Sequence, residues 1–288
     1  MTVVVRSWST RGNELDQDGL VPPRTWLSYM EHLRWESLAG DSTLELSRMM
    51  EGGHHFVVVA QQLQVEHDLG LAVPLWAELS VGHVGRSSIE FRHLFRRENT
   101  EGQILGRGTV TAVYLDPAGR PTPLPDAVRA RGGQPPDGAW AESAPGEAER
   151  ASGDGAWSAP LELPAAVPDR AWIHELEVRP SDQDLLRHVN HAVYLAYVDD
   201  TRRLCAARGG YGDVAPEGRI VRARLEYLQQ ALAGERLQVS TWVHPLPGTG
   251  PPGTGPAGTG PSPGPTLMFV IGRGGEERPV CRVAVELK

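Results

Sequence analysis

The stretch Arg179-Pro-Ser-Asp182-Gln-Asp184-Leu-Leu-Arg-His188-Val-Asn190-His-Ala-Val-Tyr194-Leu-Ala-Tyr197 decides the fold. It follows a strand-like run at 172–178 and opens with a polar turn that carries the acids Asp182 and Asp184. Asn190 is a typical helix N-cap, and the apolar side chains after it recur at helical spacing. We therefore expect a strand, an acidic turn and a helix over 190–208.

The same spacing of charged and aromatic residues occurs 168 residues earlier. The matched pairs are Arg11 with Arg179, Glu14 with Asp182, Asp16 with Asp184, Trp26 with Tyr194, Tyr29 with Tyr197, Glu31 with Asp199, and Arg34 with Arg202. The period is far longer than the roughly 20 to 50 residues of solenoid repeats. We interpret it as a duplicated domain.

In each half, the spacing of the apolar residues predicts a strand, a helix and then four strands. In the first half these are the strand 3–8, the helix 22–38 and the strands 55–65, 75–83, 88–95 and 104–115. In the second half they are the strand 172–178, the helix 190–208 and the strands 220–228, 237–244, 267–272 and 280–287. This order indicates the α+β class.

Two stretches are too rich in Pro, Gly and small residues to form a core. One separates the halves, so we expect a first domain at 1–118, a linker at 119–168 and a second domain at 169–288. The other repeats Gly-Thr-Gly-Pro between two predicted strands, and we expect a flexible loop at 247–265.

The composition excludes several classes of function. The net charge of −8 argues against nucleic-acid binding, and no apolar run or leader predicts a membrane span or a signal peptide. Two cysteines form no disulfide framework, and the histidine pairs have no third ligand at zinc-like spacing. We expect a cytoplasmic protein with no cofactor and no metal.

The acidic turn is the best candidate for chemistry. It brings Asp184 close to the amides of the first helical turn, an arrangement suited to acyl transfer because amides can polarise a carbonyl while a carboxylate attacks it or activates water. The alternative is structural: Asp182 or Asp184 could cap the helix.

The pattern Asp-x-Asp-x-x-x-His-Val-Asn-x-x-x-Tyr-x-x-Tyr resembles the opening of the hotdog thioesterases, and two such modules in one chain are similar to the acyl-carrier-protein (ACP) thioesterases. The resemblance covers both halves but neither the linker nor the Gly-Pro loop. It implies a tandem (double) hotdog, in which each antiparallel β-sheet wraps around a central helix. It also implies a thioester hydrolase acting on acyl-ACP or acyl-coenzyme A (acyl-CoA).

Carried over residue by residue, the resemblance makes Asp184 the catalytic acid and His188 the catalytic histidine. It implies substrate contacts at Asn190, His191 and Tyr194, with the amide near His191 polarising the carbonyl. Capping by His188 or Asn190 and packing of Tyr194 remain open as alternatives.

Departures from the plant-type enzymes are Leu186, where an asparagine is expected, and Gln230 and Ala231, where a Glu-Cys pair is expected. In the first half, Leu20 and Pro22 stand where His188 and Asn190 stand in the second. We therefore interpret Asp16 as a solvated turn carboxylate in a degenerate site.

Two other functions stay open: an acyl-thioester hydratase or dehydratase, and a non-catalytic protein that binds acyl thioesters. A cluster of arginines could meet coenzyme A phosphates or an acidic carrier, or simply form a solvated face; it comprises Arg86, Arg92, Arg96, Arg97, Arg202, Arg203 and Arg208. The sequence specifies neither the acyl chain length nor whether two chains form a homodimer.

Overall fold

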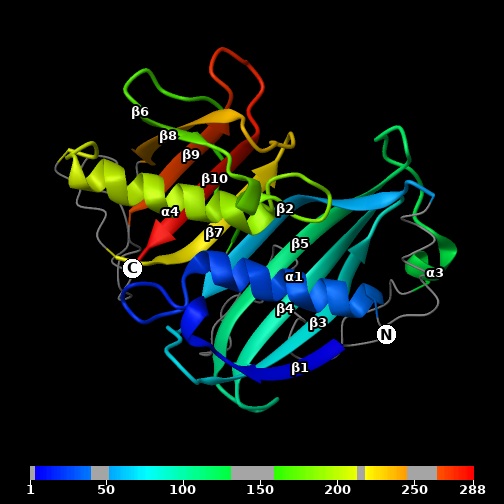
Figure 1. The fold of residues 1–288 in the computed structure, drawn as a ribbon. Coiled ribbons are helices and arrows are strands. Elements are labelled where there is room, and N and C mark those ends of the chain that lie inside the picture. The colour runs from blue at the N-terminus through cyan, green and yellow to red at the C-terminus, as the bar shows by residue number, and fades with distance from the viewer. Residues whose placement is uncertain (1–3, 40–51, 131–158, 213–217, 245–264) are drawn as a thin grey trace, which may run out of the picture. The chain divides into compact units, whose positions relative to one another are not determined.

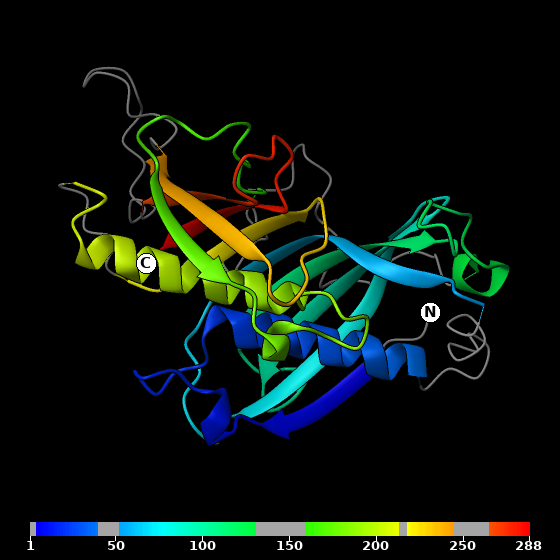
Figure 2. The same cartoon turned by 45° about the horizontal axis from the view of Figure 1, so that its top comes forward.

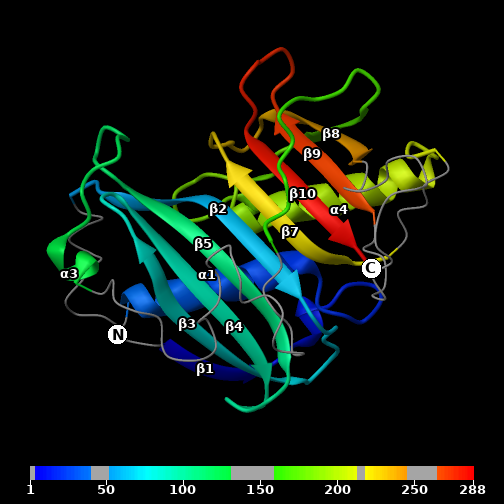
Figure 3. The same ribbon diagram turned by 180° about the vertical axis from the view of Figure 1, so that it is seen from behind.

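The computed structural model describes residues 4–39, 52–130, 159–212, 218–244 and 265–288. The chain divides into two compact units, Met1–Pro160 and Leu161–Lys288. Each unit contains one long helix and five antiparallel strands. Figures 1 and 2 show the helix of each unit running along one face of its sheet, and Figure 3 shows the opposite faces.

In the first unit, β1 (Val4–Ser9) precedes helix α1 (Pro23–Ala39). The remaining strands are β2 (His55–Val65), β3 (Pro74–Val84), β4 (Ser88–Arg97) and β5 (Ile104–Leu115). The strands lie in the order β1-β3-β4-β5-β2. Alternate residues of β4 from Ile89 to Phe95 are buried, as expected for the strand face that covers a helix, and Leu94 on the other face is buried as well.

Helix α1 packs closely against β5 because two glycines of that strand lie beneath it. A Cβ atom on Gly106 would lie 3.2 Å from the ring of Trp26, and one on Gly108 would lie 2.5 Å from Sδ of Met30. Trp26 and Met30 are fully buried. The absence of side chains at these two positions therefore leaves room for the large apolar residues of the helix.

In the second unit, β6 (Trp172–Glu177) precedes helix α4 (His191–Ala207). The strands β7 (Ile220–Tyr227), β8 (Arg236–His244), β9 (Thr266–Gly272) and β10 (Cys281–Leu287) follow. Their order is β6-β8-β9-β10-β7, which is the order of the first unit. The predicted order of elements is therefore confirmed, and the chain has the tandem hotdog fold.

The two units also share equivalent hydrogen bonds at the matched positions of the internal repeat. In the first unit, Glu14 accepts hydrogen bonds from the amide of Arg11 and the hydroxyl of Tyr29, both at 2.8 Å. In the second, Asp182 accepts the equivalent bonds from Arg179 at 2.9 Å and Tyr197 at 2.7 Å. Both acids close a short 3₁₀ helix, η1 (Gly12–Glu14) or η2 (Pro180–Asp182), which joins the first strand to the acidic turn.

The start of the predicted linker is structured. Leu115 pairs with Pro121, and a short helix α3 (Asp126–Arg129) follows. Leu124 and Val128 are buried, so this segment contributes to the core of the first unit although its composition is poor in apolar residues. Most of the predicted linker and of the Gly-Pro loop lies outside the described residues. Among the described residues, no helix is long and apolar enough to cross a membrane.

Candidate active site in the second unit

A small hairpin carries the candidate acid to the start of helix α4. Gln183 pairs with Val189, the amide of Asp184 donates to the carbonyl of His188 at 2.9 Å, and the amide of Arg187 donates to the carbonyl of Asp184 at 3.0 Å. Arg187 has a φ of 62°, the left-handed conformation typical of the last position in a three-residue hairpin loop. The predicted polar turn is therefore a closed hairpin.

The carboxylate of Asp184 is only partly used by the hairpin. Oδ1 accepts a hydrogen bond from the amide of Leu186 at 2.8 Å, and the side chain is half-buried. Within the part of the chain that the structure describes, Oδ2 has no hydrogen-bond or ion-pair partner. A carboxylate oxygen has lone pairs for further donors, so Oδ2 can accept a proton or a hydrogen bond from a bound molecule.

Asp182 has the opposite environment. Its side chain is buried, and it contacts the guanidinium of Arg179 at 3.0 Å as well as the hydroxyl of Tyr197. Burial alone would raise the pKa of Asp182, but the hydrogen bonds from Arg179 and Tyr197 outweigh it and lower the pKa below its usual value. Asp182 therefore joins the start of the motif to helix α4 and is not available to a substrate.

The helix N-cap is Asn190, and neither acid has that role. Oδ1 of Asn190 accepts a hydrogen bond from the amide of Ala192 at 2.8 Å, and its own amide donates to the carbonyl of Asp182 at 2.8 Å. The alternative in which Asp184 caps the helix is therefore wrong. The cap leaves the Asp184 carboxylate available for another role.

The two histidines lie on either side of this cap. His188 is half-buried, and its ring has no hydrogen-bond or ion-pair partner among the residues described. His191 is the first residue of α4, where the helix dipole is positive, and its carbonyl accepts a hydrogen bond from the hydroxyl of Tyr227 at 2.9 Å. Tyr227 lies on β7 and was not singled out from the sequence, because its strand has ordinary alternation.

Tyr194 lies in the core. It is 3% exposed, and its ring packs 5.5 Å from that of Tyr227 and 6.1 Å from that of Tyr197, between centroids. Burial raises the pKa of its hydroxyl. These contacts agree with the packing role that the sequence left open.

The loop between β7 and β8 lies against the base of the hairpin. The carbonyl of Ala231 accepts a hydrogen bond from the amide of Val189 at 2.9 Å, and Ala231 is fully buried. Gln230 is exposed, and its carbonyl accepts a hydrogen bond from Arg273. The positions expected to carry a Glu-Cys pair therefore lie beside the hairpin, but their side chains supply neither an acid nor a thiol.

The first unit contains the same hairpin without the same chemistry. The amide of Asp16 donates to the carbonyl of Leu20 at 2.8 Å, and Gly19 occupies the left-handed position. Oδ1 of Asp16 accepts two backbone amides, from Asp18 at 2.9 Å and Leu20 at 3.1 Å. Leu20 and Pro22 replace the histidine and the cap, so the site lacks both side chains.

Some of the arginines singled out from the sequence are engaged away from the Asp184 hairpin. Several of the arginines have acidic or aromatic partners: Arg92 pairs with Glu90, Arg202 and Arg203 pair with Asp199, and Arg208 stacks over Trp172. Among the described residues, no three His, Cys, Asp or Glu side chains are grouped so that they could hold a metal ion.

Comparison with known proteins supports the fold. No family model and no curated protein sequence matches the chain. Three solved structures are similar over nearly the whole chain. The 12:0-ACP thioesterase from Umbellularia californica has 19% identity and a TM-score of 0.71, covering 99% of this chain and 94% of its own.

The second is a putative oleoyl thioesterase from Lactobacillus plantarum, with 15% identity and a TM-score of 0.71 over 100% of this chain and 96% of its own. The third is an acyl-ACP thioesterase from Bacteroides thetaiotaomicron, with 13% identity and a TM-score of 0.70 over 99% of this chain and 98% of its own. At these identities the likeness establishes the double hotdog architecture.

Proposed function

We propose that this protein hydrolyses acyl thioesters, with Asp184 as the catalytic carboxylate. The proposal rests on the contrast between two acids of one motif. Asp182 is buried and bonded to Arg179 and Tyr197, whereas Oδ2 of Asp184 has no hydrogen-bond or ion-pair partner among the described residues. The neighbours named as thioesterases support the same reaction.

In the proposed reaction the thioester carbonyl lies near the amide of His191, where the helix dipole stabilises the oxyanion. Asp184 either removes a proton from a water molecule whose oxygen attacks the carbonyl carbon, or attacks that carbon itself to form an acyl intermediate that water then cleaves. In both routes the C–S bond breaks, the acid is released, and the thiolate leaves and takes up the proton. His188 orients the substrate or the carboxylate, and Asn190 holds the helix start.

The substrate carrier is an acyl carrier protein or coenzyme A, and two of the similar structures are named for ACP substrates. This carrier chemistry fits a cytoplasmic protein that works without a cofactor. Formation of a homodimer is compatible with the proposal but is not required by it, because the proposed groups come from one stretch of one chain.

The decisive experiment measures thiol release from acyl-ACP and acyl-CoA substrates of several chain lengths. We expect Asp184→Asn to abolish turnover while the circular dichroism spectrum and the melting temperature stay close to those of the wild type. The matched control is Asp16→Asn, which removes the equivalent carboxylate of the first unit and should leave turnover unchanged. Full activity in Asp184→Asn would refute the mechanism.

A second candidate is a non-catalytic protein that binds acyl thioesters. It is favoured by the side chains of Gln230 and Ala231, which leave Asp184 without a second acid or a thiol from the neighbouring loop. Tight binding of an acyl thioester, measured by calorimetry, without thiol release would support this function. A hydratase or dehydratase would instead change ultraviolet absorbance as an enoyl group forms or disappears.

A further inference from the structure

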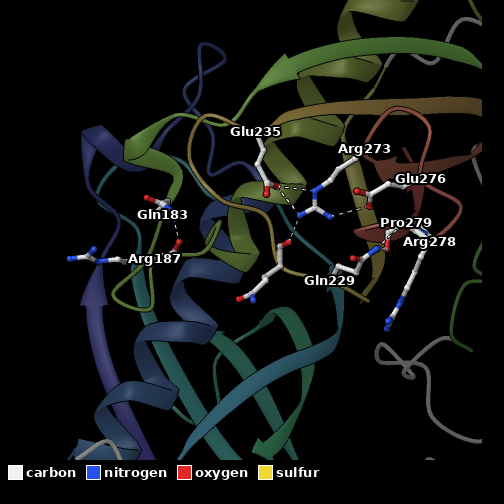
Figure 4. A network of polar contacts seen from close by, with 9 residues as sticks. Gln183, Arg187, Gln229, Glu235, Arg273, Glu276, Arg278 and Pro279 are labelled. Carbon is white, nitrogen blue, oxygen red and sulfur yellow. Dashed lines mark hydrogen bonds and ion pairs between the residues drawn. The ribbon is translucent and has the colours of Figure 1, made fainter. Parts of the chain in front are cut away.

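The loop between β7 and β8 is held by an arginine on the next hairpin. Arg273 lies just after β9, and its Nη2 donates to the carbonyl of Gln230 at 2.7 Å. The same guanidinium forms two bonds to Oε2 of Glu235, from Nη2 at 2.8 Å and from Nε at 3.1 Å (Figure 4). One side chain therefore joins two points of the loop to each other and to the β9–β10 hairpin.

The beginning of the loop is tied to the same hairpin. Nη2 of Arg278 donates to the carbonyl of Leu228 at 3.0 Å, and Nε2 of Gln229 donates to the carbonyl of Arg278 at 2.7 Å. The amides of Leu228 and Gln229 also donate to the carbonyl of Val280, at 2.9 and 3.2 Å. The loop is thus attached to the β9–β10 hairpin on both sides of Ala231.

The other side of the loop supports the Asp184 hairpin. The bond from the amide of Val189 to the carbonyl of Ala231 is buried, and Val189 is the residue that pairs with Gln183 to close the hairpin. A buried amide that loses its acceptor is costly, so the position of Ala231 determines where the hairpin base lies. Within the hairpin, the side chain of Gln183 donates to the carbonyl of Arg187.

An arginine is suited to this role because its planar fork can donate to a carbonyl and a carboxylate at once. The Arg273 side chain is 22% exposed, so its bonds are partly protected from water. A lysine at this position could replace the charge near Glu235 but has no second fixed donor for the carbonyl of Gln230.

We propose that Arg273 is a positioning residue for Asp184, acting through the backbone of the β7–β8 loop. This inference rests on the proposed thioester hydrolysis. In this view the loop contributes the Ala231 carbonyl in place of a reactive side chain. Arg273 holds that carbonyl at the position where it accepts the hydrogen bond from the amide of Val189.

The test compares Arg273→Gln with Arg222→Gln. Arg222 also pairs with a glutamate in the second unit, its Nη1 lying 2.7 Å from Oε2 of Glu286, and its side chain is 20% exposed. Each variant therefore loses an ion pair to a glutamate, and Arg273→Gln also loses the bond to the carbonyl of Gln230 in the β7–β8 loop. We expect similar small losses of melting temperature in both.

For thiol release, we expect kcat of Arg273→Gln to fall on the order of tenfold to a hundredfold with little change in KM, because a small displacement of a catalytic group is costly. Arg222→Gln should keep the wild-type kcat, and Arg273→Lys should recover part of the loss. Equal kcat values in Arg273→Gln and Arg222→Gln would overturn the proposal.

A second measurement separates this inference from the proposed reaction. Amide hydrogen exchange reports directly on the Val189 and Leu186 amides, and we expect Arg273→Gln to accelerate exchange at both while Arg222→Gln does not. If the wild type releases no thiol, the proposed function fails, and the exchange result alone supports or refutes the positioning role. Unchanged exchange in Arg273→Gln would refute it.

Discussion

The hydroxyl of Tyr197, on helix α4, donates to Oδ2 of Asp182 at 2.7 Å and so ties the helix to the segment that precedes the Asp184 hairpin. Tyr197→Phe removes this bond and leaves a buried carboxylate with fewer donors. We expect it to lower the free energy of unfolding by about 1.5–3 kcal/mol, the usual value for a hydrogen bond to a charged group. Chemical denaturation measures this loss.

The matched variant is Tyr29→Phe, which removes the equivalent 2.8 Å bond to Glu14 in the first unit. It should destabilise the protein similarly while leaving thiol release per folded molecule unchanged. A Tyr197→Phe variant as stable as the wild type would show that the bond to Asp182 does not support the fold.

Asp182 should make the stability of the protein depend on acid pH. Because its pKa is lower in the folded state than the unfolded value of about 3.9, the folded carboxylate binds fewer protons at low pH. Its stabilising contribution is complete well above pH 4 and is lost as the pH falls through the unfolded and then the folded pKa. Asp182→Asn should therefore be destabilised at pH 6, and its stability should fall less than that of the wild type between pH 6 and pH 3.

Asn190 caps helix α4, so Asn190→Ala should cost about 0.5–2 kcal/mol of stability. Serine is also a good N-cap, so Asn190→Ser should recover most of this loss. The serine variant also separates capping from substrate contact. If Asn190 only caps, kcat and KM of Asn190→Ser match the wild type; a raised KM in a fully stable Ser variant would instead indicate contact with substrate.

Arg187 has a φ of 62°, where Gly19 of the first unit has 74°. A left-handed conformation costs a non-glycine residue on the order of 1 kcal/mol, so Arg187→Gly should stabilise the second unit by up to that amount. Gly19→Ala is the converse control: nothing lies within 4 Å of the added Cβ, so its expected loss comes from the backbone alone. Thermal denaturation tests both variants: we expect the melting temperature to rise in Arg187→Gly and to fall in Gly19→Ala.

The ring of His188 has no hydrogen-bond or ion-pair partner among the described residues. Replacing it should therefore change turnover if its role is functional, and stability if its role is structural. We expect His188→Ala to change the free energy of unfolding by no more than about 0.5 kcal/mol, as for most substitutions outside bonded networks. Its thiol release should nevertheless fall, on the order of tenfold to a hundredfold, because His188 orients the substrate or the carboxylate in the proposed reaction. A large loss of stability with normal specific activity would instead assign it a structural role.

Much of the architecture could be predicted from the sequence because its signals are local. The alternation in β4 and the helical spacing after Asn190 depend only on neighbours in the chain, and the predicted elements lie within a few residues of the observed ones. Helix α3 was not predicted, since the burial of Leu124 and Val128 depends on packing within the folded first unit.

The sequence by itself determined the duplicated order of elements, the capping residue Asn190 and the short list of candidate acids, since these follow from spacing along one stretch of chain. The resemblance of the sequence already put Asp184 forward as the catalytic acid, and only the tertiary structure showed which groups engage each of the two acids. Asp182 is occupied because Tyr197 returns to it from the helix, and the Asp184 hairpin rests on Ala231, which Arg273 helps to hold. Hydrogen bonds between residues distant in the chain form only when folding brings their atoms together, and no local pattern encodes which donor reaches which acceptor.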